Sequence, residues 1–373
     1  MTTREFGFQI NNILGKARTG IISTAHGEIH TPAFMPVGTV GSVKAMTTDA
    51  INQTGAEIIL GNTYHLMLRP TAERIYELGG LHKFMNWNKP ILTDSGGFQV
   101  MSLAKLRTIS EQGVVFKSYL DGKQHMLSPE RSMEIQYFLD SNITMIFDEC
   151  TQFPIEHKEA ELSMKLSLRW AERSKLAFKE RKGYGLFGIV QGSVYKDLRL
   201  ISAKELHNIG FDGYAVGGMT ETQQALYEVL DYTIPNLPED KPHYVMGIGK
   251  PSDIIGSVIR GVDMFDCVIP TRSGRNGQAF VRSGTINIRN SKYSTDLRPL
   301  DELCKCPACI NHSRAYLNHL VKTKEILGSI LMTWHNLTFY QDLMAKIRES
   351  INIGDWSILE EWLGYSIKDM VGC

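Results

Sequence analysis

The sequence predicts an α/β fold, a (β/α)8 barrel. Seven short apolar runs each end on a polar residue or on glycines, and an earlier run, Ala33 to Val37, supplies an eighth. Amphipathic segments alternate with these runs, as helices alternate with the parallel strands of a barrel. Barrel enzymes build their active sites at the carboxyl ends of the strands. We therefore expect one active rim, formed by the residues that end the runs: Gly61-Asn62, Asp94, Asp148, Gln191, Gly217-Gly218, Gly247 and Asp266.

The length and the net charge of the chain limit the possible fold sizes and the possible binding partners. At 373 residues the chain exceeds a typical barrel of roughly 250 residues. We expect one elaborated domain, 1–373, with a subdomain at 300–340 near its C-terminal end. Forty basic and forty acidic residues give a formal net charge of zero, which excludes a global basic field that would attract nucleic acid.

One local segment is nevertheless strongly basic. The stretch from Cys267 to Thr295 contains no acidic residue, and it carries Arg272, Arg275, Arg282, Arg289 and Lys292. A solvated hairpin face and a local contact surface for nucleic acid both fit this pattern.

The chain shows no sign of export or membrane insertion. No apolar stretch approaches the roughly 18 residues that a membrane-spanning helix needs, and the N-terminus lacks the pattern of a secretion signal. Three of the six cysteines crowd into one short segment, which is not the spacing of a disulfide framework. We expect a cytoplasmic protein with no membrane partner.

Additional strands and helices are expected around the barrel. Residues 1 to about 30 alternate as short strands, which predicts a hairpin lid over the bottom of the barrel. The turn dipeptide Asp121-Gly122 predicts a hairpin within the third β/α unit. Ser128 is placed to cap a helix that begins at Pro129. The alternating pattern at 279–289 predicts another hairpin.

The most specific local pattern is the cluster Cys304, Cys306 and Cys309. Three thiols this close can hold one Zn2+, which needs a fourth ligand to complete a tetrahedron. The nearby candidates, which spacing does not distinguish, are His312, His319 and His335. A Cys3His set has no open coordination position, so we expect a structural zinc, one per chain.

Three carboxylates that follow apolar runs are candidates for catalysis: Asp94, Asp148 and Asp266. Two carboxylates that face one substrate allow glycosyl transfer, in which one attacks the anomeric carbon and the other moves protons. Each can equally cap the turn after its strand. The Asp-Ser-Gly-Gly motif around Ser95 also occurs in chymotrypsin-like proteases, but those are secreted all-β enzymes. The glycine pair favours a ligand site, because it lets backbone approach a ligand closely.

Together these motifs resemble the bacterial tRNA-guanine transglycosylases, the queuine tRNA-ribosyltransferase family. The matching segments are Thr93-Asp-Ser-Gly-Gly-Phe-Gln, Phe147-Asp-Glu-Cys, Val190-Gln-Gly, Ala215-Val-Gly-Gly, Met264-Phe-Asp-Cys-Val and the cysteine cluster with a later histidine. They occur in order over nearly the whole chain. The resemblance implies a zinc-bearing TIM barrel that acts as a homodimer. It also implies replacement of the wobble guanine of tRNA by a 7-deazaguanine base, 7-aminomethyl-7-deazaguanine, in queuosine biosynthesis.

The resemblance assigns the catalytic roles. Asp266 is the expected nucleophile at the ribose anomeric carbon, and Asp94 is the expected general acid/base. A covalent ribosyl-aspartate would make the exchange ping-pong, and two inversions would give net retention of configuration. No ATP or sugar nucleotide is implied.

The resemblance also assigns contacts to the base. Asp148, Gln191 and the backbone amide of Gly218 are expected to read its polar edge, because a carboxylate accepts from the N1–H and 2-amino groups that adenine lacks. Phe98 and Met246 match the positions that sandwich the ring. Two more expected contacts are Cys150 and Gly217.

Two further sets of residues follow from the resemblance. Arg272 and Arg275 match the segment that holds the anticodon nucleotides, where unstacked bases and phosphates are presented together. Alignment with the family selects His335 as the fourth zinc ligand.

One loop departs from the family pattern. After Gly218 the chain reads Met219-Thr220-Glu221-Thr222, shorter than the Leu-Ala-Val-Gly-Glu of many bacterial relatives. In the family this loop borders the substituent at position 7 of the base, and Glu221 is the expected counterpart of its glutamate. A shorter loop would admit the bulkier base queuine, whereas a compensated loop would keep the aminomethyl base. Both alternatives stay open.

A rival interpretation is a non-catalytic tRNA-binding subunit of the same fold. The presence of Asp94, Asp148, Gln191 and Asp266 argues against it. An archaeal-type enzyme that acts in the D-arm would carry extra C-terminal RNA-binding domains, for which the segment after His335 leaves no room.

Overall fold

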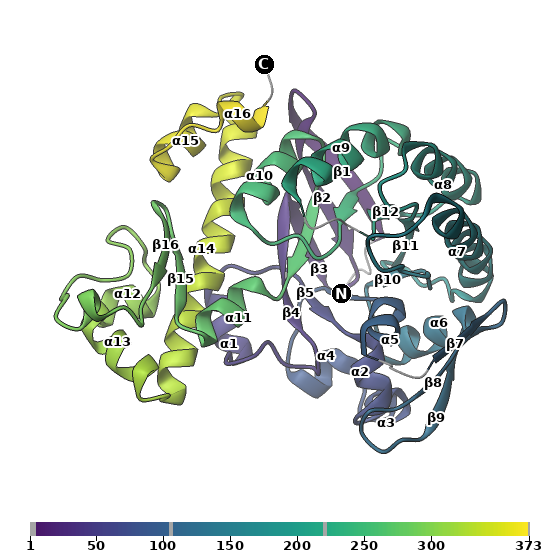
Figure 1. Cartoon of the computed structure of the whole chain (residues 1–373), viewed down its shortest axis with the longest axis horizontal. Helices are drawn as coiled ribbons and strands as arrows, with labels where there is room; N and C mark the ends of the chain where they lie inside the picture. Colours follow the sequence, from purple (N-terminus) through teal and green to yellow (C-terminus); the bar gives the residue numbers. More distant parts are fainter. Residues whose placement is uncertain (1–4, 104–106, 219–221, 372–373) are drawn as a thin grey trace.

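Eight parallel strands close into a barrel, as the sequence predicts (Figure 1). The computed structural model describes residues 5–103, 107–218 and 222–371. The barrel strands are β4 (Ala33–Gly38), β5 (Ile59–Gly61), β6 (Ile91–Thr93), β10 (Ile143–Met145), β11 (Gly185–Val190), β12 (Gly213–Val216), β13 (His243–Val245) and β14 (Met264–Cys267). The ring closes where β14 pairs with β4, with Met264 opposite Ala33.

Helices follow the strands and surround the barrel (Figure 1). Those before the C-terminal region are α1 (Thr48–Gln53), α2 (Thr63–Leu68), α3 (Ala72–Glu77), α4 (Gly80–Met85), α5 (Gly97–Leu103), α6 (Pro129–Phe138), α7 (His157–Ala177), α8 (Lys196–Ile209), α9 (Gln223–Thr233), α10 (Pro251–Ile259) and α11 (Ile269–Arg275). The predicted cap of α6 is confirmed, because the Ser128 hydroxyl accepts from the backbone N–H of Arg131.

A three-stranded antiparallel sheet covers the amino end of the barrel. It consists of β1 (Gly7–Leu14), β2 (Ala17–Thr24) and β3 (Gly27–Thr31). The predicted hairpin is therefore present and gains a third strand. Phe6 places its ring over Gly185, the first residue of β11, where a Cβ would come within 2.6 Å of that ring. The lid consequently lies at the end opposite to the predicted active rim.

A second antiparallel sheet interrupts the third β/α unit. It consists of β7 (Arg107–Ser110), β8 (Gly113–Lys117) and β9 (Gln124–Leu127). The Asp121-Gly122 turn lies between β8 and β9, which confirms the predicted hairpin. Arg169 and Arg173 of α7 anchor this sheet through Glu111 and through the carbonyl of Gln112.

The C-terminal region packs beside the barrel (Figure 1). Its elements are β15 (Gln278–Val281), β16 (Gly284–Asn287), α12 (Pro307–Asn311), α13 (Arg314–Lys322), α14 (Ile326–Ile353), α15 (Ser357–Leu363) and α16 (Lys368–Val371). Two 3-10 turns, Ile234–Asn236 and Ser291–Tyr293, complete the secondary structure of the described residues. Helix α14 contacts α11, α12 and β15 and also strands β1, β2 and β4, so it joins the cysteine segment to the barrel.

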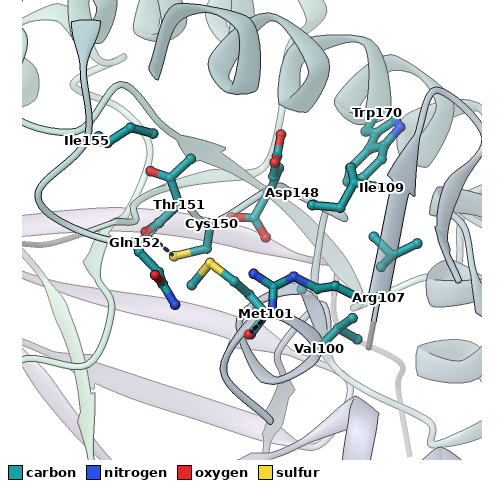
Figure 2. Close-up of a pocket in the computed structure, with 13 residues that line it drawn as sticks. Val100, Met101, Arg107, Ile109, Asp148, Cys150, Thr151, Gln152, Ile155 and Trp170 are labelled. Atoms are coloured by element: carbon teal, nitrogen blue, oxygen red, sulfur yellow. Dashed lines mark hydrogen bonds between the residues drawn. The ribbon is translucent and has the colours of Figure 1, made fainter. Parts of the chain in front are cut away.

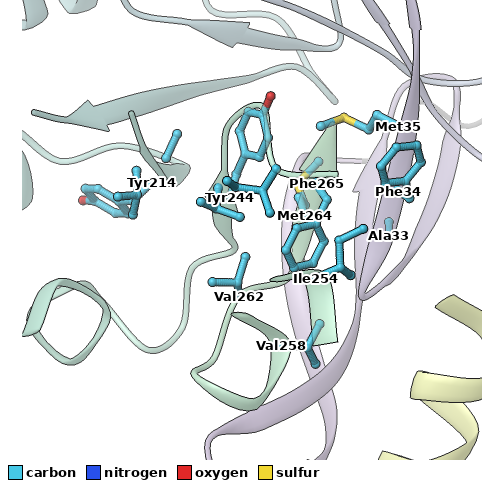
Figure 3. Packing of buried hydrophobic residues seen from close by; sticks show 14 of the residues in the cluster. Ala33, Phe34, Met35, Tyr214, Tyr244, Ile254, Val258, Val262, Met264 and Phe265 are labelled. Atoms are coloured by element: carbon cyan, nitrogen blue, oxygen red, sulfur yellow. The ribbon is translucent and has the colours of Figure 1, made fainter. Parts of the chain in front are cut away.

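The barrel core is built from large apolar side chains. Phe34, Met35, Met264 and Phe265 are at most 1% exposed and pack in one cluster with Tyr244 (Figure 3). Their burial stabilises the barrel, at roughly 25 cal/mol per Å² of apolar area removed from water. Among the residues that the structure describes, no helix combines the length and the hydropathy needed to span a bilayer.

Candidate active site

Asp94 directly follows β6 and is buried at the rim of the barrel. The backbone N–H of Thr63 donates to its Oδ1 (2.8 Å), and the side-chain amide of Asn62 donates to its Oδ2. Burial raises the pKa of Asp94 to about 7, against the lowering effect of these two donors, and the Asp266 carboxylate raises it further. A carboxyl group with this pKa can give and take a proton at neutral pH.

Asp266 lies within β14 and is partly exposed. The Tyr244 hydroxyl (2.6 Å) and the backbone N–H of Gly247 (2.8 Å) both donate to Oδ1. No donor among the described residues reaches Oδ2. Burial raises the pKa of this carboxyl group, and the two donors oppose that effect. The arrangement fixes the carboxylate by one oxygen and leaves the other with free lone pairs.

Asp148 follows β10 and accepts two side-chain hydrogen bonds. The Ser95 hydroxyl donates to Oδ1 (2.9 Å), and the Gln191 amide donates to Oδ2 (2.7 Å). All three side chains are buried, and burial raises the pKa of Asp148. Ser95 therefore acts as a hydrogen-bond donor to Asp148, in keeping with the rejection of a protease nucleophile. The predicted pair Asp148 and Gln191 is in direct contact.

Glycines make this close packing possible. A Cβ on Gly97 would lie 2.4 Å from the carbonyl oxygen of Asp148, and a Cβ on Gly217 would lie 2.9 Å from the Gln191 amide nitrogen. Gly218 has a φ of +61°, and a Cβ there would lie 2.6 Å from Gln191 Oε1. The glycine pairs read in the sequence are thus required by close approach to Asp148 and Gln191.

A cavity of about 220 Å³ opens beside Asp148. Its lining includes Gly97, Asp148 and Cys150 together with Met101 and Arg107 (Figure 2). Burial and the nearby Asp148 raise the pKa of the Cys150 thiol to about 12, so the thiol is neutral. The residues that line this cavity do not include Asp94, Gln191 or Asp266.

The two residues expected to sandwich a ring both have accessible side chains. Phe98, near the start of α5, is 54% exposed. Met246 directly follows β13 and is partly exposed. Met219, Thr220 and Glu221, in the loop that departs from the family pattern, lie outside the described residues, and Thr222 caps α9.

The basic segment divides into two parts. Arg272 and Arg275 lie in the last turn of α11, which directly follows β14, and Arg272 is exposed. Burial and the neighbouring Arg272 lower the pKa of Arg275. Arg282, in contrast, forms an ion pair with Asp301. Within the described ranges of the chain, Arg272 and Arg275 therefore have no ion-pair partner, whereas Arg282 is paired with Asp301.

Cys304, Cys306, Cys309 and His335 converge in the C-terminal region. His335 Nδ1 lies 3.6, 3.6 and 3.3 Å from the three sulfur atoms. Its Nε2 lies 2.7 Å from the carbonyl oxygen of Phe280, which places the proton on Nε2 and leaves Nδ1 free for a metal. These separations fit a tetrahedral ion held at about 2.0–2.3 Å, the distances of zinc. The four residues can hold a metal ion.

Two residues that position the carboxylates received no role from the sequence. Asn62 was expected at the rim because it follows the apolar run Ile59–Gly61, but no function was assigned to it. Tyr244 lies inside the apolar run of β13 and reads as a core residue. Its contact with Asp266 depends on how β13 and β14 pair, with Val245 opposite Phe265.

The comparisons with known proteins agree with this geometry. The sequence model of the family described as Queuine tRNA-ribosyltransferase matches residues 14–364. A queuine tRNA-ribosyltransferase of Rickettsia massiliae is 64% identical over 352 residues, which are 94% of this chain and 98% of the relative. Relatives of the same name from Rickettsia akari and Rickettsia typhi are 63% and 62% identical over the same shares. The chain therefore belongs to the queuine tRNA-ribosyltransferase family of pentosyltransferases.

Proposed function

We propose that the protein exchanges the wobble guanine of tRNA for 7-aminomethyl-7-deazaguanine through a covalent ribosyl-aspartate intermediate. The observation that carries this proposal is the pairing of two different carboxyl groups at one rim. Both donors to Asp266 that the described residues supply reach Oδ1 and leave Oδ2 available, and Asp94 has a pKa of about 7. The first suits nucleophilic attack, and the second suits proton transfer at neutral pH.

In the first half-reaction, Oδ2 of Asp266 attacks C1′ of the ribose. A C1′–O bond forms and the C1′–N9 bond breaks, with its electron pair passing to the departing guanine. Protonated Asp94 supplies the proton that neutralises this base. Tyr244 and Gly247 hold the attacking carboxylate in one orientation through Oδ1. Because the carboxylate is already oriented, less conformational entropy is lost when the transition state forms.

The second half-reaction reverses these steps with the new base. Ionised Asp94 accepts the proton from the five-membered ring of the 7-deazaguanine, whose nitrogen attacks C1′ and displaces Asp266. Each attack inverts C1′, so the product keeps the configuration of the substrate.

The proposed base contacts are those that the family resemblance implies, and the hydrogen bonds of Asp148 support them. We place the N1–H and 2-amino edge of the base against Asp148, which Ser95 and Gln191 already orient. Gln191 and the Gly218 amide are assigned to the same polar edge of the base, with Cys150 and Gly217 beside them. Phe98 and Met246 would cover the two faces of the ring. This set favours guanine-like bases, because adenine lacks the N1–H and 2-amino donors that the Asp148 carboxylate would accept from.

Exchange of labelled guanine into a tRNA with a wobble guanine tests the activity, with each deaza base as competitor. We expect exchange, inhibited mainly by the aminomethyl base. Stronger inhibition by queuine would indicate the alternative, a salvage enzyme with a wider pocket. Absence of exchange would favour the third candidate, a non-catalytic tRNA-binding subunit.

The raised pKa of Asp94 predicts how base release depends on pH. Release needs protonated Asp94, so the single-turnover rate of guanine release should fall as the pH rises through about 7. The Asn62 amide lowers this pKa, so Asn62→Ala should move the midpoint to higher pH. Rapid-quench measurements from pH 5.5 to 9 would show both effects. An unchanged midpoint in Asn62→Ala would assign the proton to a different group.

Arg272 and Arg275 are proposed to hold the anticodon phosphates. We expect Arg272→Ala to raise the KM for tRNA, to reduce the salt slope of tRNA binding by about one, and to leave the KM for guanine unchanged. Arg298→Ala is the matched control, because Arg298 is exposed and paired with Asp296 outside the basic segment. Equal effects of the two substitutions would exclude a specific role for Arg272.

We further propose that the cysteine cluster and His335 hold one structural zinc ion, in a subdomain at 300–340 of a single domain that spans 1–373. The same region exposes large apolar side chains, at Leu303, Ile310 and Ile326. Exposed apolar side chains in one region are typical of an interface, which supports the homodimer that the family resemblance implies. Sedimentation analysis of the purified protein would test that assembly.

A further inference from the structure

Arg199, on α8, is a buried cation with an unusual set of partners. Its side chain is fully buried, and in the part of the chain that the structure describes no carboxylate lies within ion-pair distance. A buried charge is costly unless hydrogen bonds satisfy it. Here three main-chain carbonyls do so. Nη1 donates to Val190 (2.7 Å), Nε to Ser193 (2.7 Å) and Nη2 to Gly218 (3.2 Å).

The three carbonyls belong to the two segments that carry the proposed base contacts. Val190 and Ser193 flank the loop of Gln191, and Gly218 follows β12. Ser202, one turn farther along α8, accepts from the backbone N–H of Gln191 (3.1 Å). One face of α8 thus contacts the Gln191 loop at both of its ends, Val190 and Ser193. The same face also contacts Gly218, which follows the neighbouring strand β12.

The contact between α8 and the Gln191 loop is close, so a shift of α8 would also shift the loop. A Cβ on Gly192 would lie 3.0 Å from the backbone nitrogen of Arg199, so the loop rests directly on α8. The pKa of Arg199 is lowered by burial to about 10, so the side chain stays protonated at neutral pH. A planar guanidinium can direct donors to three carbonyls at once, whereas a lysine ammonium presents a single centre.

We propose that Arg199 is a positioning residue, which fixes Gln191 and Gly218 relative to each other and so sets the affinity of the enzyme for the purine-like base. The role rests on the proposed function. It differs from a general contribution to folding, because the effect should appear in the binding of the base and should not appear in the binding of tRNA.

Guanine exchange by Arg199→Lys and Arg199→Gln tests this role. We expect the KM for guanine to rise about tenfold or more in Arg199→Gln, with a smaller rise in Arg199→Lys, while the KM for tRNA stays within about twofold. Arg348→Lys is the matched control. Arg348 also donates to main-chain carbonyls, of His30 and Pro32, but it lies near the lid at the opposite end.

The outcomes separate the possibilities. A folded Arg199 variant whose KM for guanine stays within about twofold of the wild-type value overturns the inference. So does a rise of the same size in Arg348→Lys, or failure of both Arg199 variants to fold, since either result would make the role structural. Lack of exchange by the wild-type protein would instead overturn the proposed function, and this inference with it.

Discussion

Asp266→Asn should abolish base exchange, with a loss of at least about 10³-fold. Asparagine keeps the size of the side chain and can still accept from Tyr244 and Gly247 through its carbonyl oxygen. It replaces Oδ2 with an amide nitrogen, however, which has no lone pair available for attack on C1′. Labelled-guanine exchange measures the loss. In parallel, wild-type protein with tRNA and no free base should give a covalent protein–tRNA band on a denaturing gel.

Two variants make the result specific. Asp212→Asn is the matched control, because Asp212 accepts from the backbone N–H of Leu186 (2.9 Å) at the amino end of the barrel, and its exchange rate should stay near the wild-type value. Tyr244→Phe removes one of the two donors to Asp266 and should lower kcat by a smaller factor than Asp266→Asn. A covalent band in Asp266→Asn would show that another group, with Asp94 the first candidate, is the nucleophile.

Cys306→Ala should abolish binding of the proposed zinc ion and unfold the 300–340 segment. Apparent binding free energies of structural zinc sites are about 10–16 kcal/mol, which matches or exceeds the whole stability of a typical domain, about 5–15 kcal/mol. Loss of the ion should therefore melt this segment while the barrel strands stay folded. Metal analysis would measure the zinc, and amide hydrogen exchange would locate the loosened residues. We also expect weaker dimerisation, because the exposed apolar side chains belong to the same region.

The choice of His335 is tested by a second substitution. His312 was an equal candidate from spacing, but its ring stacks on Tyr316 and is not part of the cluster. His312→Ala should therefore keep one zinc per chain, whereas His335→Ala should lose it. A Cys306→Ala protein that stays dimeric and zinc-loaded would contradict this account of the site.

The barrel could be predicted because each of its strands is buried on both faces. Runs such as Ile59–Gly61 and Gly185–Val190 are apolar throughout, and a polar residue or a glycine marks the end of the runs at the rim. The extra strands β3 and β7 were harder to predict. Both are edge strands of small sheets, and a short edge strand needs little apolar patterning. The side on which it pairs depends on neighbours distant in the sequence.

The carboxylates of the candidate site could be predicted from the sequence, whereas the residues that position them were harder to predict. Asp94, Asp148 and Asp266 stand out because acids at strand ends are conspicuous in an apolar context. Tyr244 is hard to recognise from the sequence because it lies within an apolar run. Its ring packs in the core, and only its hydroxyl group reaches Asp266. Arg199 is hidden as well, because an arginine on an amphipathic helix is usually expected to face solvent. Its burial follows from the packing of α8 against two separate loops.

The two donors to Oδ1 of Asp266 have a consequence for the reversibility of the exchange. In a ribosyl ester, Oδ1 would become the carbonyl oxygen, and Tyr244 and Gly247 would continue to withdraw electron density from it. The aspartate would then depart readily when the incoming base attacks. Under the proposed mechanism, one pair of hydrogen bonds would orient the carboxylate for its attack and would weaken the ester bond before the second displacement. The covalent intermediate would then not be a deep energy minimum, as a reaction that must run the same step in both directions requires.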